Sequence, residues 1–182
     1  MGKIVIISGP SGAGKTTICK HLEKDSQQVV RSISVTTRPP RQNEKNGEAY
    51  EFVSPSEFEK MIKNGELAEY ARYCGHYYGT LLRTVEEALK KDCICLLEID
   101  VQGALQIKQR FPQAISIFLL PPEKETLKRR LMQRNANGGQ DMLLRLEAAE
   151  KELSYKDQYD YRVVNDKLEV TINTIRNILK VN

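Results

Sequence analysis

A glycine-rich segment near the start of the sequence, GPSGAGKT at residues 9–16, carries the clearest chemical signal. It follows an apolar run and opens an amphipathic stretch, so it is expected to lie between a strand and a helix. There the glycines let backbone N–H groups converge on phosphate oxygens at the positive end of the helix. Lys15 reaches the outer phosphates, and the Thr16 hydroxyl is a ligand for Mg²⁺. The predicted nucleotide-binding residues are Gly9, Pro10, Ser11, Gly12, Ala13, Gly14, Lys15, Thr16 and Thr17.

An acidic pair ends a second apolar run, CLLEID, in which Glu98 and Asp100 are two residues apart and project to the same side. In a parallel sheet this strand end lies beside the loop after the first strand, where ligands bind. Carboxylates there suit Mg²⁺ and its waters, so we predict that Thr16 binds the ion with Glu98 or Asp100 acting through water. The alternative is a solvated pair of charges at a strand end.

Two arginines, Arg38 and Arg41, lie three residues apart in the segment SVTTRPPR, with two prolines stiffening the chain between them. The sequence contains no Asp or Glu from residue 26 to residue 43, so it offers neither arginine a local partner. We therefore expect the two guanidinium groups to clamp the phosphate of an acceptor molecule, with hydroxyl groups of Tyr50 and Tyr78 as further donors. A solvated loop is the alternative.

The glycine-rich loop alone leaves the class of protein open. A GTPase is expected to carry an NKxD motif that reads guanine, whereas the sequence has only NDK at residues 165–167, in the wrong order. A helicase or a transporter ATPase normally needs a longer chain. We therefore predict a kinase for a small phosphate-bearing acceptor, because such an enzyme needs positioning and charge neutralisation and no covalent nucleophile.

Glu69 lies in the alternating segment ELAEY, which can direct one carboxylate into a pocket. A carboxylate only accepts hydrogen bonds, so it suits a base with two adjacent donors. Guanine presents N1–H beside its 2-amino group, whereas adenine has an acceptor at N1 and nothing at position 2. Glu69 in such a pocket would favour guanine and would be left unpaired by adenine. The alternative is an ordinary surface residue of a strand.

The composition is that of one soluble globular unit. The chain has 182 residues, of which 40% are hydrophobic and 29% are charged, and it contains no apolar run of membrane-spanning length. We see no export signal and expect the cytoplasm. Lys and Arg alternate with Glu in most helical segments, so the net charge of +4 does not predict nucleic-acid binding. The four cysteines show no CxxC spacing, so we expect neither zinc nor disulfides and interpret them as core residues: Cys19, Cys74, Cys93 and Cys95.

Apolar β-branched runs alternate with amphipathic stretches, which predicts an α/β fold: a parallel-sheet core with helices on both faces. The expected strands cover residues 3–8, 29–35, 93–99, 114–120 and 161–165. The expected helices cover residues 15–24, 83–91, 101–110, 123–134, 141–157 and 168–181. The turn-rich stretch 36–80 is interpreted as an inserted lobe with one short helix. The segment SPSE predicts the start of this helix, with Ser54 as cap, Pro55 in the first turn and Glu57 closing a capping box.

Six segments together resemble the guanylate kinases in order and spacing, over nearly the whole chain: GPSGAGKTT, SVTTRPPR, NGEAYEFVS, GELAEYARYCGHYYGT, LLEIDVQGA and DYRVVND. The resemblance implies transfer of the γ-phosphoryl group of Mg-ATP to GMP, giving ADP and GDP. It also implies a single domain in three parts. These are a core (1–33, 81–125 and 158–182), a GMP-binding lobe (34–80) and a helical lid (126–157).

The resemblance assigns roles residue by residue. Ser34, Glu69 and Thr80 resemble the guanine readers, and Asp100 resembles the acid near GMP and the metal. The implied GMP-binding set is Ser34, Arg38, Arg41, Glu44, Tyr50, Glu69, Tyr78, Thr80 and Asp100. The implied catalytic set, which includes the arginines of the lid, is Lys15, Arg38, Arg130, Arg134 and Arg145.

Two segments depart from the family pattern. The lid reads RNANGGQD where family members usually have glycine and an acidic cluster, which bears on the ordering of the lid, and Val101 replaces an aromatic residue. Two other functions stay open. One is an inactive guanylate-kinase-like interaction domain, and the other is a kinase for another mononucleotide. Nothing in the sequence predicts the oligomeric state, and Gly65, Gly138 and Gly139 are candidate hinges for closure.

Overall fold

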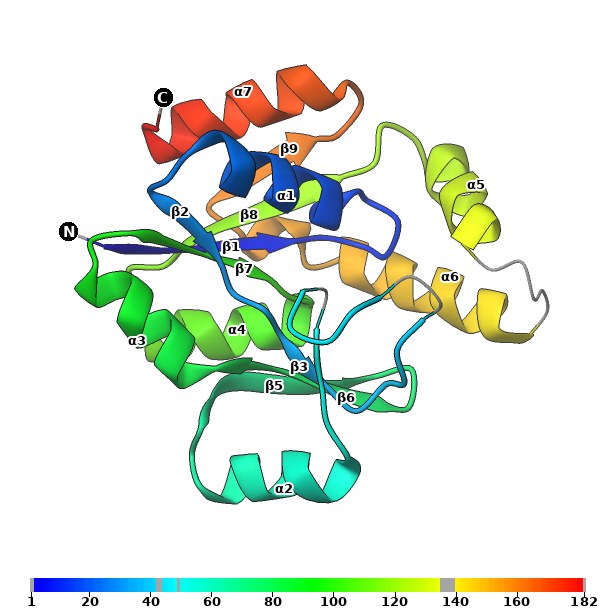
Figure 1. Cartoon of the computed structure of the whole chain (residues 1–182). Helices are drawn as coiled ribbons and strands as arrows, with labels where there is room; N and C mark the ends of the chain where they lie inside the picture. The colour runs from blue at the N-terminus through cyan, green and yellow to red at the C-terminus, as the bar shows by residue number, and fades with distance from the viewer. Residues whose placement is uncertain (1, 42–43, 49, 135–139, 182) are drawn as a thin grey trace. The chain divides into compact units, whose positions relative to one another are not determined.

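The computed structural model describes residues 2–41, 44–48, 50–134 and 140–181 (Figure 1). Contacts within the chain group it into two units. Unit 1 comprises Met1–Ile6 and Gln28–Ile115, and unit 2 comprises Ile7–Gln27 and Ser116–Asn182.

The larger sheet has five strands in the order β2-β7-β1-β8-β9. Strands β2 and β7 pair in parallel, as do β8 and β9, so the predicted α/β fold with a parallel sheet is confirmed. The central strands are apolar throughout because they are buried on both faces. The bounds are β1 Lys3–Ser8, β2 Val29–Arg31, β7 Ile94–Glu98, β8 Ile115–Leu120 and β9 Tyr161–Val164.

A four-stranded sheet in the order β4-β3-β6-β5 lies wholly within unit 1. It is formed by β3 Val35–Thr36, β4 Glu51–Phe52, β5 Leu67–Tyr73 and β6 His76–Leu81. The prediction of one strand over 29–35 was therefore wrong, because β2 belongs to the larger sheet and β3 to the smaller one. Most of this sheet lies in the stretch 36–80, for which we predicted one short helix and no strands. Strands of two residues are too short to show alternation, so no pattern marked β3 or β4.

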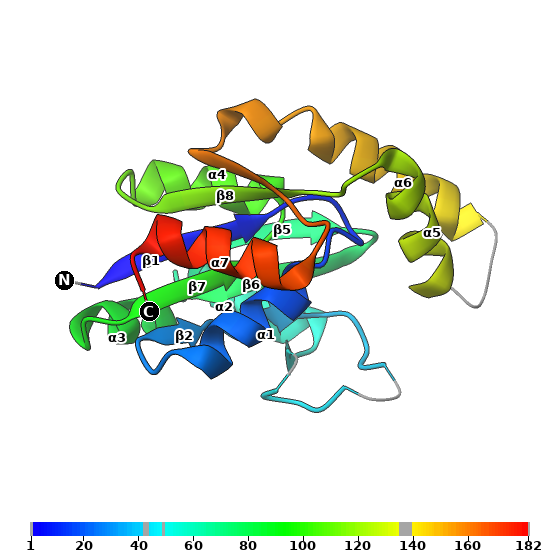
Figure 2. The ribbon, with the colours of Figure 1, turned by 90° about the horizontal axis from the view of Figure 1, so that it is seen from above.

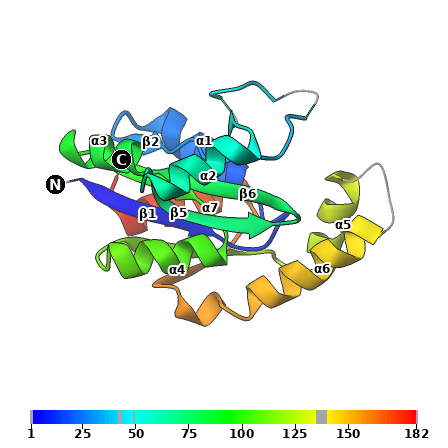
Figure 3. The same ribbon diagram turned by 90° about the horizontal axis from the view of Figure 1, so that it is seen from below.

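The predicted short helix of the lobe is confirmed as α2, Pro55–Lys63. Ser54 Oγ accepts a hydrogen bond from Glu57 N at 3.2 Å, and Glu57 Oε2 accepts one from Ser54 N at 2.8 Å, which completes the capping box. Phe58 on this helix is fully buried against Val35 of β3 and neighbouring apolar side chains. Figure 3 shows α2 lying along the four-stranded sheet, whose core it completes.

Two further helices belong to unit 1, α3 Leu82–Lys90 and α4 Val101–Arg110. Helix α3 packs against β7, and α4 packs along β5. Asp100 is the N-cap of α4, because its Oδ1 accepts a hydrogen bond from Gly103 N at 2.9 Å.

Unit 2 contains α1 Lys15–Asp25, α5 Lys124–Arg134, α6 Gln140–Leu153, α7 Leu168–Leu179 and a 3₁₀ helix, Lys156–Gln158. The predicted helix 141–157 thus ends early and continues as 3₁₀ turns. Helices α1 and α7 lie side by side (Figure 2) and are tied by an ion pair of Arg176 with Asp25, 2.6 Å between Nη2 and Oδ2. Within the described part of the chain, none of the helices is both long and apolar enough to cross a membrane.

The cysteines follow the prediction only in part. Cys19 and Cys95 are buried core residues as expected, and Cys93 is partly buried. Cys74 is exposed in the turn between β5 and β6, so its interpretation as a core residue was wrong. Its φ is positive, 47°, as the tight turn of this hairpin requires. The turn fixes the backbone there and leaves the side chain exposed.

Candidate active site

The glycine-rich loop lies between β1 and α1 as predicted, and two of its glycines are required by geometry. Gly9 has a φ of 136°, and a Cβ there would come within 2.4 Å of Leu119 O. Gly14 has a φ of 93°, and a Cβ there would come within 2.4 Å of Asn165 Nδ2. No other residue fits these two positions without moving the neighbouring chain. The loop therefore has the compact backbone that a phosphate cradle needs.

Lys15 folds back over this loop. Its Nζ donates hydrogen bonds to Gly9 O at 2.5 Å and Pro10 O at 3.2 Å. An ammonium group has three donors, so the lysine is held against the loop by carbonyl groups and keeps donor capacity for an anion. Thr16 and Thr17 stand in the first turn of α1, where the helix dipole favours phosphate.

Asn165 holds the same loop and was not among the predicted site residues. It is buried, and its side-chain Nδ2 donates to Ala13 O at 2.7 Å, while its backbone N donates to Leu120 O at 2.8 Å. Asn165 directly follows β9, so its side chain anchors the glycine-rich loop to the end of that strand. Its signals in the sequence were its position after an apolar strand and its place in the segment DYRVVND, and such an amide is also common in turns.

The arginine loop of unit 1 corrects one expectation. Arg38 has a local partner, because its Nη2 lies 3.0 Å and 2.9 Å from the two carboxylate oxygens of Glu44. Glu44 Oε2 also accepts from Arg41 N at 2.9 Å. The stretch without acids ends at residue 43, and the turn brings the next residue, Glu44, back to Arg38. Partial burial favours a higher pKa for Glu44, but the Arg41 N–H and the Arg38 guanidinium outweigh it and lower the pKa below its ordinary value.

Aromatic rings surround Arg38 on its other side. Its Cζ lies 5.3 Å from the centre of the Tyr50 ring and 5.8 Å from that of Phe52, both within cation–π range. Tyr78 meets Tyr50 edge to face, with ring centres 5.9 Å apart. Burial, aided by the charge of Glu98, raises the pKa of Tyr50 to about 12, so its hydroxyl stays protonated at neutral pH. The structure thus brings together Arg38, Tyr50 and Tyr78 as predicted.

Two threonines fix the start of the arginine loop, and sequence reasoning missed both. Thr36 Oγ1 donates to Tyr77 O at 2.8 Å and accepts from Arg38 N at 3.1 Å. Thr37 Oγ1 accepts from Tyr77 N at 2.9 Å. These bonds continue the pairing of β3 with β6 beyond the last ladder residue, so the backbone at Arg38 is fixed by the sheet.

Glu69 and Thr80, two of the predicted base readers, are cross-strand partners in β5 and β6. Glu69 is only 5% exposed, and its Oε1 accepts from Thr80 Oγ1 at 2.6 Å. Burial raises the pKa of Glu69 to about 7, the Thr80 hydroxyl opposes that rise and the charge of Asp100 adds to it. In its ionised form this carboxyl group keeps acceptor capacity beyond the Thr80 hydrogen bond and can accept hydrogen bonds from a ligand.

Three other predicted residues lie at the ends of their strands. Ser34 precedes β3 and is partly buried, and its carbonyl accepts from Glu51 N at 2.9 Å. Glu98 ends β7 and is partly buried. Asp100 commits one oxygen to capping α4. The hydroxyl of Thr16 and the carboxylate of Glu98 are each hard oxygen donors of the kind that Mg²⁺ prefers.

The predicted lid residues are described only by their backbone. Arg130 and Arg134 lie one turn apart on α5, and Arg145 lies on α6. Their side chains, and the residues 135–139 that include Gly138 and Gly139, lie outside what the structure describes.

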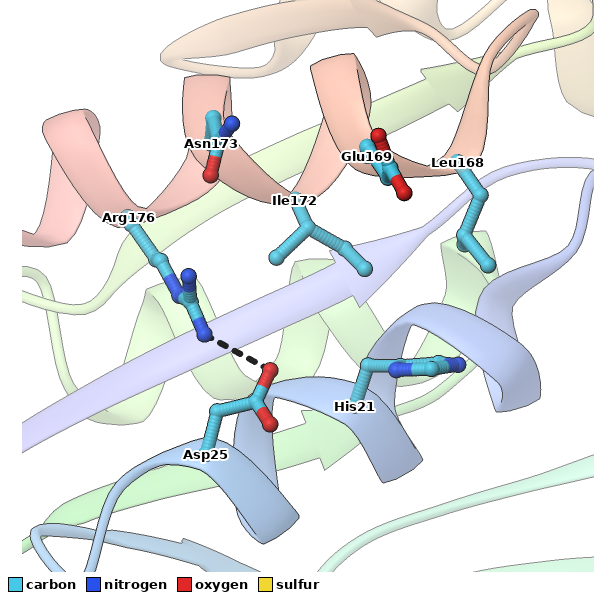
Figure 4. Close-up of a pocket in the computed structure, with 7 residues that line it drawn as sticks. All are labelled: His21, Asp25, Leu168, Glu169, Ile172, Asn173 and Arg176. Carbon is cyan, nitrogen blue, oxygen red and sulfur yellow. Dashed lines mark hydrogen bonds and ion pairs between the residues drawn. The ribbon is translucent and has the colours of Figure 1, made fainter.

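One surface cavity of about 380 Å³ lies between α1 and α7 (Figure 4). Its lining includes His21, Glu169 and the ion pair of Asp25 with Arg176, and none of the predicted site residues. Figure 4 shows the ion pair at one end of the cavity and His21 toward the other. The cavity therefore belongs to the packing of two helices and not to the site described above.

A glycine-rich loop between the first strand of a parallel sheet and a helix is the phosphate-binding arrangement of P-loop proteins, and this fold and loop place the chain among the P-loop phosphotransferases. A family model described as "Guanylate kinase" matches residues 1–182. The chain belongs to the guanylate kinase family.

Individual relatives agree with this assignment. The sequence is 44% identical over 178 residues to a guanylate kinase of Desulfitobacterium hafniense (strain Y51), covering 98% of this chain and 89% of that protein. It is 43% identical over 180 residues to one of Fusobacterium nucleatum subsp. nucleatum, covering 99% and 97%. A crystal structure of guanylate kinase from Anaplasma phagocytophilum superimposes with a TM-score of 0.83 at 36% identity, covering 98% of this chain and 85% of that one.

Proposed function

We infer that the protein transfers the γ-phosphoryl group of ATP to GMP, forming ADP and GDP in a reversible reaction. The observation that carries the choice of acceptor is the buried Glu69, hydrogen-bonded to Thr80 within the lobe that also holds Arg38. A base with adjacent N1–H and 2-amino donors satisfies that carboxylate, and adenine does not. Family membership supports the same reaction.

On the donor side, we assign ATP to the glycine-rich loop of unit 2, with backbone N–H groups and Lys15 binding its phosphates. Thr16 is the proposed protein ligand of Mg²⁺. Glu98 or Asp100 is the proposed partner of the waters of the ion, and one oxygen of Asp100 also caps α4. Bound Mg²⁺ supplies neutralisation of phosphate charge. Arg130, Arg134 and Arg145 are proposed to stabilise the migrating phosphoryl group.

On the acceptor side, we assign the phosphate of GMP to Arg38, Arg41, Tyr50 and Tyr78, and its base to Ser34, Glu69 and Thr80. Asp100 contributes charge near Glu69. Glu44 acts through its contacts with Arg38 and the Arg41 backbone, which hold both arginines in one turn. Phosphoryl transfer is direct and in line, since no covalent intermediate is needed.

The proposal includes the organisation and setting of the enzyme. The parts are a core (1–33, 81–125 and 158–182), a GMP-binding lobe (34–80) and a lid (126–157), with Gly65 as a hinge of the lobe. The reaction supplies GDP for purine nucleotide metabolism in the cytoplasm, where ATP and GMP are its small-molecule partners. We propose no nucleic-acid or membrane partner.

A coupled assay with ATP, Mg²⁺ and each nucleoside monophosphate tests the function. GMP is expected to be phosphorylated with a kcat/KM at least about a hundredfold above that of AMP, because adenine leaves Glu69 unpaired. Similar rates with AMP and GMP would remove the guanine assignment. Absence of phosphorylation of every nucleotide would favour a non-catalytic interaction domain.

The elevated pKa of Glu69 predicts a pH dependence. The ionised carboxylate binds guanine, and the protonated form accumulates as pH falls below about 7, so KM for GMP is expected to rise about tenfold from pH 8 to pH 6. The phosphate of GMP also titrates near this range, so the Glu69→Gln variant, which lacks the carboxyl titration, is the matched control. Parallel KM profiles for the two proteins would refute the assignment.

Asn165 provides a test on the donor side. Removing its amide in Asn165→Ala frees Ala13 O and loosens the glycine-rich loop, so KM for ATP is expected to rise about tenfold while KM for GMP stays within about twofold. Initial-rate kinetics in both substrates measure this. Asn173→Ala on α7 is a control for loss of an amide in unit 2. An unchanged KM for ATP would show that the anchor is dispensable.

A further inference from the structure

Helix α4 binds strand β5 through the side-chain amide of Gln106. Gln106 Oε1 accepts from Tyr70 N at 3.2 Å, and Gln106 Nε2 donates to Tyr70 O at 2.7 Å. The amide thereby bonds to the backbone as a residue of a neighbouring strand would. Strand β5 is at the edge of its sheet, so these backbone groups have no strand beside them among the described residues. Tyr70 directly follows Glu69, so the amide fixes the chain next to the proposed guanine reader.

Two other residues on the same face of α4 contact the same stretch. Gly103 lies one turn before Gln106, and a Cβ there would come within 2.3 Å of Glu69 Oε2. Arg110 lies one turn after it, and its Nη1 donates to Leu67 O at 3.2 Å. Residues spaced in this way share one helix face. We call Gly103, Gln106 and Arg110 the α4 clamp.

The clamp acts where the sheet itself is irregular. The pairing of β5 with β6 shifts register between Leu67 and Glu69, so a regular ladder does not fix the backbone that carries the carboxyl group. Arg110 binds the chain before this shift and Gln106 binds it after. Gly103 leaves room for Glu69 Oε2, while Thr80 engages Oε1. The carboxyl group is therefore bonded at Oε1, has room at Oε2, and is carried by a backbone that α4 binds on both sides of Glu69.

We propose that the α4 clamp sets the guanine specificity of the enzyme by fixing the direction of the Glu69 carboxylate, and that Gln106 is a positioning residue for base selection. The proposal rests on the proposed function, in which Glu69 reads the base. A carboxylate that must meet N1–H and the 2-amino group together discriminates only while its direction is fixed. The clamp supplies that direction without touching the nucleotide.

The test compares Gln106→Met, which keeps side-chain length and loses both hydrogen bonds, with Gln109→Met. Gln109 is an exposed glutamine on the same helix. The readouts are kcat and KM for GMP, for ATP and for IMP, which lacks the 2-amino group. In Gln106→Met, KM for GMP is expected to rise about tenfold, while KM for ATP stays within about twofold of the wild type. The preference for GMP over IMP is expected to fall toward the preference of Glu69→Gln. Gln109→Met is expected to match the wild type.

Gly103→Ala provides a second route if Gln106→Met does not fold. Alanine is a better helix former than glycine, so the helix is retained, while the new Cβ displaces Glu69 Oε2. It is expected to lose preference for GMP over IMP and to shift the pH profile of KM for GMP.

Several outcomes would overturn the proposal. If the folded variants lose thermal stability but keep the wild-type GMP to IMP ratio and pH profile, the clamp is only structural. If Glu69→Gln itself keeps the wild-type ratio, Glu69 does not read the base, and the proposed guanine reading fails together with the clamp. The Glu69 variant alone thus separates failure of the function from failure of the clamp.

Discussion

Replacing Lys15 with methionine is expected to reduce kcat by at least about a thousandfold while leaving the Kd for GMP within about twofold. The ammonium group is held by Gly9 O and Pro10 O directly above the glycine-rich loop, where the phosphates of ATP are assigned. Charge that develops during phosphoryl transfer then loses the cation assigned to stabilise it. The acceptor groups belong to unit 1 and do not depend on this side chain.

Steady-state kinetics and calorimetric titration with GMP measure the two quantities. Lys20→Met is the matched control, because Lys20 is an exposed lysine on the same helix. It is expected to leave both kcat and the affinity for GMP unchanged. A Lys15→Met protein with near-normal kcat would contradict the assignment of ATP to this loop.

The second large effect is expected for Arg41→Met, which should raise KM for GMP about thirtyfold and change KM for ATP by less than about twofold. The guanidinium of Arg41 is exposed, and its backbone N–H is held by Glu44, the residue that also pairs with Arg38. Methionine keeps much of the chain length and removes a bidentate, charged donor. The phosphate of GMP therefore loses one of its two proposed cationic contacts.

Arg83→Met serves as the control, since Arg83 is an exposed arginine of unit 1 outside the proposed site, with a side chain 69% exposed. Its kinetics should match the wild type. If Lys15→Met and Arg41→Met impaired binding of the same substrate, the division into donor and acceptor regions would be wrong.

Features determined by neighbouring residues were predictable from the sequence. The glycine-rich loop requires positive φ angles at Gly9 and Gly14, and only glycine adopts them freely, so the motif itself marks the geometry. The capping box at Ser54 is likewise complete within four residues. Apolar runs in the sequence predicted the long buried strands. Each of these signals lies within one element.

Features that depend on distant segments were missed. Gln106 meets Tyr70 across 36 residues, and Asn165 meets Ala13 across 152 residues, and neither side chain differs by type from an ordinary surface amide. The pairing of Arg38 with Glu44 depends on how the loop turns, which counting acids in a window cannot detect. Only the fold gives these residues their roles.

The central claim is that two separate groups of residues each bind one nucleotide, and a crystal structure with GMP and an unreactive ATP analogue tests it most directly. The account predicts phosphate oxygens of GMP within hydrogen-bond distance of Arg38 and Arg41, the guanine edge on Glu69, and the ATP phosphates on the glycine-rich loop beside Lys15. A GMP phosphate bound with both guanidinium groups turned away from it would contradict the account.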